Sequence, residues 1–245
     1  MDNQFEQYGY VHVPRFLTGN ALGNITSIVE RYHAQWMSDY QQHYQGGLIN
    51  SAYLTRGDKV AQSNMRPLFE LVAGDPLFNH MTSIFPSTFV FMNCQLFFNP
   101  YNPQQNNYWH RDGQYHLDLE QQKQALASVQ VLHCRIALRD EPGIELVPGT
   151  HTRWDTPLEL STRLETDGRF KHEALPNTHI QPMAAGDLLI FSANMLHRGL
   201  YGNDRLALDI LYCENEAHLT EHIDRSCYPS DGVKDGLQHP EIFES

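Results

Sequence analysis

The feature that most constrains the fold is a set of metal-binding residue types whose members lie far apart in the sequence. His110 and Asp112 are two positions apart in the segment 109–112, and a further histidine, His197, follows much later. Residues i and i+2 of an extended segment project to the same side of the chain, so His110 and Asp112 can hold one ion together. His197 can join them only from a distant strand. The sequence therefore predicts a fold in which remote strands meet around a metal ion.

The residue types indicate which metal and which chemistry to expect. Two histidines and one carboxylate suit divalent iron, and they leave three coordination positions open on the opposite face for a co-substrate and dioxygen. Arg205 lies a few residues beyond His197. A guanidinium is the group that a dicarboxylic co-substrate needs as its anchor. This combination is typical of an oxygenase.

Four blocks of sequence, in order along the chain, resemble a known family. They are FEQYGYVHVPRFLT (5–18), NNYWHRDGQYH (106–116), RIALRDEPGIELVPGTH (135–151) and AAGDLLIFSANMLHRGLYGNDRLALDILY (184–212). Together they resemble the phytanoyl-CoA dioxygenase-like (PhyH) family of Fe(II)/2-oxoglutarate-dependent oxygenases over most of the chain.

The resemblance implies a set of catalytic residues and cofactors. His110, Asp112 and His197 match the family's iron ligands, and Arg205 matches the residue that binds the far carboxylate of 2-oxoglutarate, as a bidentate guanidinium can. The implied cofactors are Fe(II), 2-oxoglutarate and O2, with ascorbate supporting activity. Halogenating relatives carry a small residue in place of the carboxylate, so Asp112 favours hydroxylation of an unactivated C–H bond.

The chain departs from the family pattern at two places. The interval from His197 to Arg205 is a few residues shorter, which bears on the Arg205 assignment and not on the iron ligands. The connection between Asp140 and Pro148 is also compact. It lacks the longer Asn-Gly insertion that is often found there.

The implied fold is mainly β: a double-stranded β-helix (a jelly-roll, cupin-like barrel) with N-terminal helices packed on one sheet. At 245 residues the chain suits a single domain of this kind over 1–245. Apolar residues recur at helical spacing between Leu17 and Trp36, which predicts an amphipathic helix that covers one sheet. A second helical region, Arg66–Ile84, is interrupted by the helix-stop signal at Gly74–Pro76.

The run Thr88–Asn99 predicts a barrel strand with two different faces. Alternation gives an apolar face of Val90, Met92, Cys94, Leu96 and Phe98, and a mixed face of Phe89, Phe91, Asn93, Gln95, Phe97 and Asn99. Amides among aromatic rings suit a pocket for a small polar ligand, so we predict Asn93 at the substrate and Gln95 and Asn99 near the co-substrate. The alternative is that these amides only satisfy neighbouring backbone groups.

The run Val129–Leu138 leaves the direction of two side chains open. One of its faces is plainly core, whereas His133 and Arg135 face either solvent or the barrel interior. An interior Arg135 would favour a substrate that carries a carboxylate, and an exposed arginine would need no explanation. Trp109 and Tyr115 flank the metal-binding residues and are candidates for the substrate pocket wall, unless they only pack beside a strand end.

The last strand, Arg205–Cys213, places Arg205, Ala207 and Asp209 on one face. The small Ala207 leaves room for the co-substrate. Asp209 could pair with Arg205 or contact the substrate, although we expect a structural role as the partner of an arginine. His151 is expected to stabilise its turn rather than to bind metal.

Two polar segments are candidates for lids over the barrel mouth. They are Gln114–Ser128, which follows the metal-binding residues, and Thr152–Asn177. Loops near a barrel mouth are where substrate choice is usually built.

Composition and charge limit the classes of partner and substrate that we expect for this chain. The net charge of −12 argues against a nucleic-acid partner, and the 17 Lys and Arg form no cluster suited to coenzyme A phosphates, so we predict a small, non-CoA substrate. No apolar run approaches the roughly 18 residues of a membrane span, and the N-terminus lacks a signal-peptide core, so no membrane partner is expected. The four cysteines lack CxxC spacing, which indicates reduced, buried thiols in a cytoplasmic protein. The substrate's identity and the oligomeric state stay open.

Two other classes of function are compatible with the sequence. One is a metal-dependent cupin-type enzyme that does not use 2-oxoglutarate, such as a hydrolase or isomerase, which would act with Zn(II) or Mn(II) and form no succinate. The other is a non-catalytic ligand-binding barrel, which would retain its ligand after His110→Ala.

Overall fold

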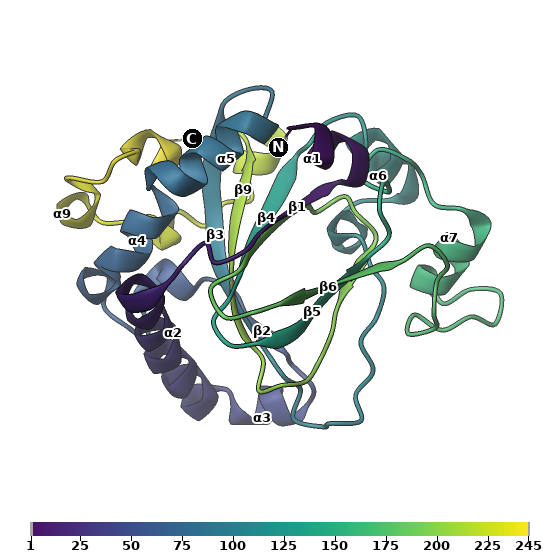
Figure 1. The fold of residues 1–245 in the computed structure, drawn as a ribbon, viewed down its shortest axis with the longest axis horizontal. Helices are drawn as coiled ribbons and strands as arrows, with labels where there is room; N and C mark the ends of the chain where they lie inside the picture. Colours follow the sequence, from purple (N-terminus) through teal and green to yellow (C-terminus); the bar gives the residue numbers. More distant parts are fainter. Residues whose placement is uncertain (1, 245) are drawn as a thin grey trace.

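The computed structural model describes residues 2–244, which form two antiparallel β-sheets. The larger sheet has the strand order β1-β7-β4-β9-β3-β2, and the smaller has the order β6-β5-β8. The strands are β1 Tyr10–Val13, β2 Asn50–Ser51, β3 Phe89–Phe98, β4 Val131–Ala137, β5 Glu141–Leu146, β6 His179–Met183, β7 Leu188–Ser192, β8 His197–Gly199 and β9 Leu206–Glu214. In Figure 1 the small sheet lies in front of the large one. The predicted double-stranded β-helix is confirmed.

Helices cover the outer face of the large sheet. The helices are α1 Asp2–Tyr8, α2 Gly19–Asp39, α3 Gln41–Gln45, α4 Arg66–Val72, α5 Asp75–Ile84, α6 Leu119–Ala125, α7 Pro157–Leu164, α8 Ala217–Thr220 and α9 Asp231–Lys234. Figure 1 shows α2, α4 and α5 on one side of the sheets and α6 and α7 on the other. The main hydrophobic core joins α2, α4 and α5 to β3, β4 and β9. The opposite face of the large sheet is therefore left to line the interior between the sheets.

The predicted amphipathic helix is α2, and its apolar stripe packs on the sheet as expected. Ile25, Ile28, Val29, Tyr32 and Trp36 are its buried residues. The Tyr32 hydroxyl lies 2.8 Å from Ser51 Oγ of β2, and this hydrogen bond satisfies the polar end of a buried ring. The predicted interruption at Gly74–Pro76 is also present, since α4 ends at Val72 and α5 begins at Asp75.

Strand β3 follows the predicted alternation in its second half only. Phe91 pairs with Tyr212 and Asn93 pairs with Leu211, so Met92 is an extra residue in the ladder. A bulge of this kind exchanges the two faces of a strand on one side of it. Upstream of the bulge the prediction was wrong: Phe89 and Phe91 pack with the main core, while Val90 and Met92 belong to a separate cluster.

Strands β4 and β9 keep the predicted alternation throughout. The core faces of β4 and β9 contribute Leu132, Cys134, Ile136, Leu206, Leu208, Ile210 and Tyr212 to the main core. The opposite faces carry His133 and Arg135 on β4 and Asp209 on β9, and all three line an interior cavity. The open question about His133 and Arg135 is thereby answered: both face the interior.

A bulge in β5 turns Glu141 inward. The register shifts between Glu141 and Ile144, and Gly143 lies so close to β6 that an added Cβ would be 1.8 Å from Gln181 O. Gly143 also has φ of 88°, a conformation that other residues rarely adopt. As a result Glu141 and the cavity-lining Ile144 both point to the interior, although regular alternation would have separated them.

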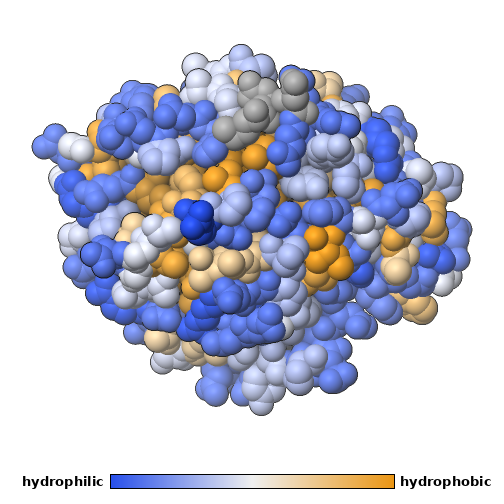
Figure 2. Space-filling view, in the orientation of Figure 1, coloured by the Kyte–Doolittle hydropathy of each residue, from blue (hydrophilic) through white to orange (hydrophobic). Residues whose placement is uncertain are grey.

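The four cysteines agree with the prediction of reduced, buried thiols. Cys94, Cys134, Cys213 and Cys227 are buried and free. Hydrophilic residues cover most of the face seen in Figure 2, with hydrophobic residues between them in small groups. Within residues 2–244 every helix is too short or too polar to cross a membrane.

Candidate metal centre

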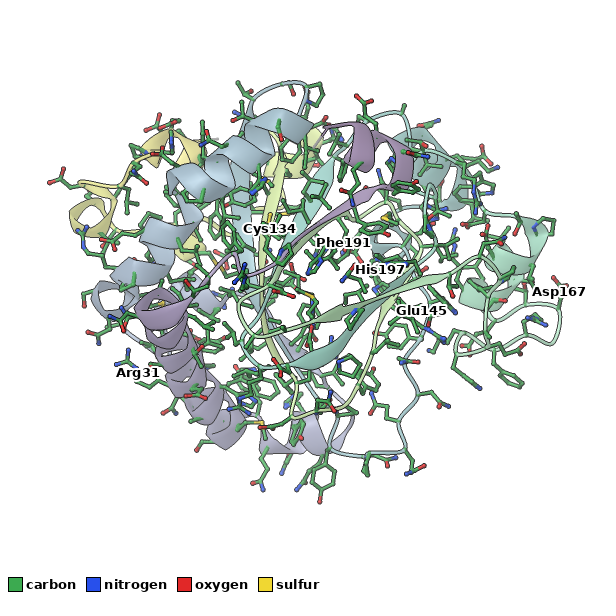
Figure 3. All side chains as sticks on the ribbon, in the orientation of Figure 1. Arg31, Cys134, Glu145, Asp167, Phe191 and His197 are labelled. Atoms are coloured by element: carbon green, nitrogen blue, oxygen red, sulfur yellow. The ribbon has the colours of Figure 1, made fainter. Side chains whose placement is uncertain are left out.

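The structure brings His110, Asp112 and His197 together. Their ligand atoms all lie within 4.8 Å of one another. His110 and His197 form an isolated antiparallel bridge, in which each backbone N–H donates to the other's carbonyl at 3.0 Å. The Asp112 N–H donates to Ala193 O at 3.2 Å. Backbone pairing with β8 and the turn before it therefore fixes where the 110–112 segment lies. Figure 3 shows His197 in the interior, close to Phe191 of β7.

The two histidine rings are oriented by backbone carbonyls. His110 Nδ1 lies 3.2 Å from Tyr108 O, and His197 Nδ1 lies 3.0 Å from Met195 O. Both Nε2 atoms then face Asp112 Oδ1, at 3.5 Å and 3.7 Å. Hydrogen bonds of this kind fix the tautomer and the direction of metal-binding imidazoles. Burial lowers the pKa of His197 to about 3, which favours the neutral form that binds metal.

His133 holds the other oxygen of Asp112. Its Nε2 lies 2.5 Å from Asp112 Oδ2, and its Nδ1 lies 3.1 Å from Asp209 Oδ2. The ring also stacks on Phe191, with centroids 4.7 Å apart. Burial alone would lower the pKa of His133, but the charges and hydrogen bonds of Asp209 and Asp112 outweigh it and raise the pKa to about 10. The same contacts hold the pKa of Asp112 below its ordinary value, against the effect of burial.

Sequence reasoning missed this role of His133, and it was wrong about Asp209. Asp209 bonds to an imidazole and not to an arginine. The alternation of β4 and β9 placed both side chains on one side of their sheet. The third member, Asp112, comes from a segment outside the regular strands, so strand patterns alone could not have revealed the contact.

Arg111, which separates His110 from Asp112, holds the 110–112 segment in place through contacts on the side away from the two ligands. Its backbone is extended (φ −113°, ψ 140°), so its side chain points away from the two ligands. Nε and Nη2 donate to Asp155 Oδ1 at 2.9 Å and 2.7 Å, and Nη1 donates to Thr150 O and Asn194 O. The carboxylate of Asp155 also accepts from Arg163 Nε of α7 at 2.6 Å. A buried ion-pair cluster thus ties the metal-binding segment to α7.

Arg205 lies in the same cavity with unused hydrogen-bond donors. The residue is 3% exposed, and its Nε and Nη1 have no hydrogen-bond partner among the described residues. Its nearest carboxylate oxygen, Glu141 Oε2, is 3.5 Å from Nε. Burial lowers the pKa of Arg205 to about 10, with the nearby Arg135 acting in the same direction. A buried guanidinium with unpaired donors is suited to an incoming carboxylate.

Arg135 also lines the cavity, and two of its three nitrogen atoms donate to Glu141. Nε and Nη2 donate to the two oxygens of Glu141 at 3.0 Å and 3.1 Å. Arg135 and Arg205 therefore share Glu141 as their counter-ion. Gly199 adjoins this group, and an added Cβ there would lie 2.7 Å from Arg205 Nη2.

The cavity has a volume of about 1050 Å³, and several predicted residues line it. Besides the residues of the metal centre and the two arginines, Asn93, Gln95 and Tyr115 contribute to its wall. Tyr115 is 54% exposed, and its ring centroid is 5.9 Å from that of His110.

Asn99 and Trp109 are not among the cavity-lining residues, in contrast to the predictions made for them. Asn99 Oδ1 accepts from Gly202 N at 2.8 Å, so its amide holds the turn before Arg205. Trp109 is fully buried, and its indole N–H donates to Glu173 O at 2.9 Å. His151, for which no metal role was expected, is buried against Phe5 outside the cavity.

The segments around the mouth differ from the predicted lids. Gln114–Ser128 does contribute to the wall, through residues that include Tyr115, Gln121 and Gln124. Thr152–Asn177 contributes none of the lining residues. Two segments that the sequence did not single out, 49–53 and 218–222, contribute instead. They carry no motif that could have indicated this position.

Comparison with known proteins relates the chain to one family and one fold. The family model described as Phytanoyl-CoA dioxygenase (PhyH) matches residues 5–201, and the match ends before Arg205. A search of curated protein sequences found no match.

Solved structures share the fold at low sequence identity. EctD from S. alaskensis with bound Fe has a TM-score of 0.62 at 13% identity, over 87% of this chain and 75% of that chain. HygX from Streptomyces hygroscopicus with nickel and 2-oxoglutarate bound has a TM-score of 0.61 at 14% identity, over 88% of this chain and 90% of that chain. The non-haem α-ketoglutarate-dependent epimerase SnoN from nogalamycin biosynthesis has a TM-score of 0.58 at 17% identity, over 87% of this chain and 80% of that chain.

Proposed function

Because the chain belongs to the phytanoyl-CoA dioxygenase family, we propose that it is an Fe(II)- and 2-oxoglutarate-dependent oxygenase that hydroxylates an unactivated C–H bond of a small, non-CoA molecule. One observation carries the proposal. A two-histidine, one-carboxylate cluster and a buried guanidinium with unpaired donors line the same cavity. The first group suits divalent iron, and the second suits the far carboxylate of a dicarboxylic acid.

The residues present fit both groups. His110 Nε2, His197 Nε2 and Asp112 Oδ1 already converge, and each histidine is held by a hydrogen bond at its other nitrogen. Arg205 Nε and Nη1 are buried donors in need of an acceptor, which costs free energy until one is bound. When bound, Fe(II) with 2-oxoglutarate and dioxygen supplies the oxidising chemistry, in which the oxo acid becomes succinate and carbon dioxide.

The protein's own residues then orient the reactants and exclude side reactions. His133 occupies Asp112 Oδ2, so that Oδ1 alone is turned toward the two histidines. Arg205 orients the co-substrate from one end of the cavity. Its Cζ atom lies 5.6 Å from the ring centroids of both Phe97 and Tyr201. Orientation and exclusion of side reactions are what a protein contributes around such a metal.

Charge and cysteine chemistry support the finer parts of the proposal. Among the described residues, Arg135 and Arg205 are the only arginines or lysines that line the cavity, and both face Glu141. The phosphates of coenzyme A would find no further guanidinium or ammonium partner in the described part of the cavity lining. Four free, buried thiols agree with a reducing, cytoplasmic environment.

The test is succinate formation from 2-oxoglutarate under air, with Fe(II) and ascorbate and no added substrate. We expect slow turnover by the wild type and none by Asp112→Ala, while Asp231→Ala, on exposed α9, matches the wild type. Calorimetry of the Ni(II)-loaded protein with 2-oxoglutarate gives an independent readout of co-substrate binding. An absence of both turnover and binding would contradict the proposal and favour a metal-dependent hydrolase or isomerase, or a ligand-binding barrel.

A further inference from the structure

Two arginines of the cavity approach each other from opposite sides of a pair of alanines. Arg135 lies two positions before Ala137, and Arg205 lies two positions before Ala207. The two alanines are partners in the antiparallel β4–β9 ladder, so the arginines flank this pair from opposite ends. Each arginine Cζ lies close to the ring centroid of Phe97, which pairs with Ala207, at 5.2 Å and 5.6 Å. Both guanidiniums therefore extend over the space that the small alanines leave.

One carboxylate, that of Glu141, lies between the two guanidiniums. It accepts from Nε and Nη2 of Arg135 at 3.0 Å and 3.1 Å, and its Oε2 lies 3.5 Å from Arg205 Nε. The three side chains are at most 2% exposed. Two guanidiniums and one carboxylate leave one positive charge in excess, and a buried charge without a counter-ion is costly. The carboxylate of a ligand would supply the missing counter-ion.

The carboxylates that line the cavity do not pair with these arginines. Asp209 lies opposite Arg135 in the β4–β9 ladder, but its Oδ2 is 3.1 Å from His133 Nδ1. Asp112 belongs to the metal centre. Glu221 lies at the mouth, with a side chain that is 67% exposed. Among the described residues, Glu141 is therefore the one carboxylate in an ion pair with either arginine.

Both arginines keep N–H groups that no residue of the described chain accepts. Arg205 Nε and Nη1 are buried without a hydrogen-bond partner. Arg135 uses Nε and Nη2 for Glu141, whereas its Nη1 makes no hydrogen bond within residues 2–244. Unpaired buried donors cost free energy until an acceptor binds. The two oxygens of one carboxylate can accept from both guanidiniums at once.

Strand β4 fixes the order of these groups along the cavity. His133, which contacts the metal centre, comes first, and Arg135 and Ala137 follow at alternate positions on the same face. Arg135 thus lies between the metal centre and the alanine pair, and Arg205 lies beyond that pair. A ligand that reaches from the metal to Arg205 must pass Arg135.

We propose that Arg135 is a second anchor for the distal carboxylate of 2-oxoglutarate, which it binds together with Arg205, while Glu141 positions the two guanidiniums. The inference rests on the proposed function, which places 2-oxoglutarate in this cavity with its distal carboxylate at Arg205. The carboxylate that an interior Arg135 was expected to favour is then that of the co-substrate and not that of the substrate.

The test compares two oxo acids that differ only at the distal end. 2-Oxopentanoate has the carbon chain of 2-oxoglutarate with a methyl group in place of the distal carboxylate. Each acid is titrated calorimetrically into the full Ni(II)-loaded chain, as wild type and as Arg135→Met. We expect Arg135→Met to weaken 2-oxoglutarate binding about tenfold, as for one lost charge-assisted hydrogen bond, and to leave 2-oxopentanoate binding unchanged. A purely structural role of Arg135 would weaken the binding of both acids alike.

A second pair of variants separates direct contact from an effect through Glu141. In Arg135→Met the released carboxylate of Glu141 could pair with Arg205 and block it. Glu141→Gln removes this competing charge, so Glu141→Gln is compared with the double variant Arg135→Met/Glu141→Gln. We expect the double variant to bind 2-oxoglutarate about tenfold more weakly than Glu141→Gln. It also leaves no buried carboxylate of Glu141 unpaired, which favours its folding.

The matched control is Arg31→Met on the exposed surface of α2, which should leave both titrations unchanged. Three results would overturn the inference while sparing the proposed function: wild-type binding of 2-oxoglutarate by Arg135→Met, equal losses for the two acids, or equal affinities in the two Glu141→Gln proteins. Failure of 2-oxoglutarate to bind the Ni(II)-loaded wild type is a separate result. It would overturn the proposed function as well.

Discussion

The two ends of the cavity differ in how completely their polar groups are paired. At the metal end the Nδ1 atoms of His110 and His197 face backbone carbonyls, and Asp112 Oδ2 is held by His133. At the other end Arg205 is buried with Nε and Nη1 unpaired. Paired groups fix geometry before a ligand arrives, whereas unpaired buried donors gain their partner from the ligand. The metal end is therefore preorganised, and the arginine end depends on its ligand.

The largest effect should come from removing the carboxylate at the metal end. Asp112→Ala deletes a ligand and also leaves His133 without one of its two carboxylate partners. We expect Ni(II) binding to fall below detection in calorimetry, while Asp231→Ala binds like the wild type. Retention of wild-type Ni(II) affinity by Asp112→Ala would show that the ion binds elsewhere.

Replacing Arg205 should weaken the binding of the co-substrate alone. Arg205→Met is expected to raise the 2-oxoglutarate dissociation constant about a hundredfold or more, because truncating one partner of a buried charge pair costs about 2–5 kcal/mol. Ni(II) affinity should stay at the wild-type value. Arg31→Met, on the exposed surface of α2, is the matched control. If Arg205→Met lost Ni(II) binding as well, the two ends would not be independent.

His133 tests whether the preorganisation of the metal end matters. His133→Ala removes the hydrogen bond to Asp112 Oδ2, and loss of such a supporting partner typically costs tenfold to a hundredfold in metal affinity. We expect His133→Gln, which retains one donor, to lie between His133→Ala and the wild type. Absorption spectra of the Co(II)-loaded variants would report any change in coordination. The surface variant His172→Asn is the control, and equal affinities in all four proteins would refute a positioning role.

The smallest effect should come from a single methyl group beside Arg205. A Cβ at Gly199 would lie 2.7 Å from Arg205 Nη2, so Gly199→Ala must displace the guanidinium. We expect about tenfold weaker binding of 2-oxoglutarate, since a displaced charged hydrogen bond costs about 1.5 kcal/mol. Gly232→Ala, which has nothing within 4 Å of its added Cβ, should bind normally. Unchanged binding in Gly199→Ala would mean that Arg205 anchors the ligand from another position.

The sequence predicted which residues form the metal centre, but it did not predict most of the contacts that hold these residues and the two arginines in place. His110, Asp112 and His197 could be placed together because a local spacing and a family resemblance both mark them. Alternation also put His133 and Arg135 on one face of β4, and Arg205, Ala207 and Asp209 on one face of the last strand, since β4 and β9 are regular where these residues lie. It left open whether the face with His133 and Arg135 meets solvent or the barrel interior. The partners of these residues come from other parts of the chain. Glu141 faces inward only because of a bulge at Gly143.

Irregularities of the strands explain most of the errors. The extra residue Met92 exchanged the faces of β3 upstream of it, which misplaced Phe89 and Phe91. Strand β3 ends at Phe98, so alternation no longer applied to Asn99, whose amide bonds Gly202 instead. The position of a bulge or of a strand end depends on how neighbouring strands pair. The apolar and polar alternation along one strand contains no information about that pairing.

The anchoring of Arg111 has a consequence for anyone who would redesign this protein. Asp155 binds both Arg111, between two of the metal-binding residues, and Arg163 of α7. Helix α7 contributes no residue to the cavity wall. Through the Arg163–Asp155–Arg111 contacts it nevertheless helps to hold the metal-binding segment in place. Substitutions meant to broaden substrate scope belong in 114–128 and 218–222, which contribute to the wall. Replacing or shortening the segment around Asp155 would instead disturb the metal centre, which is needed for the reaction of any substrate.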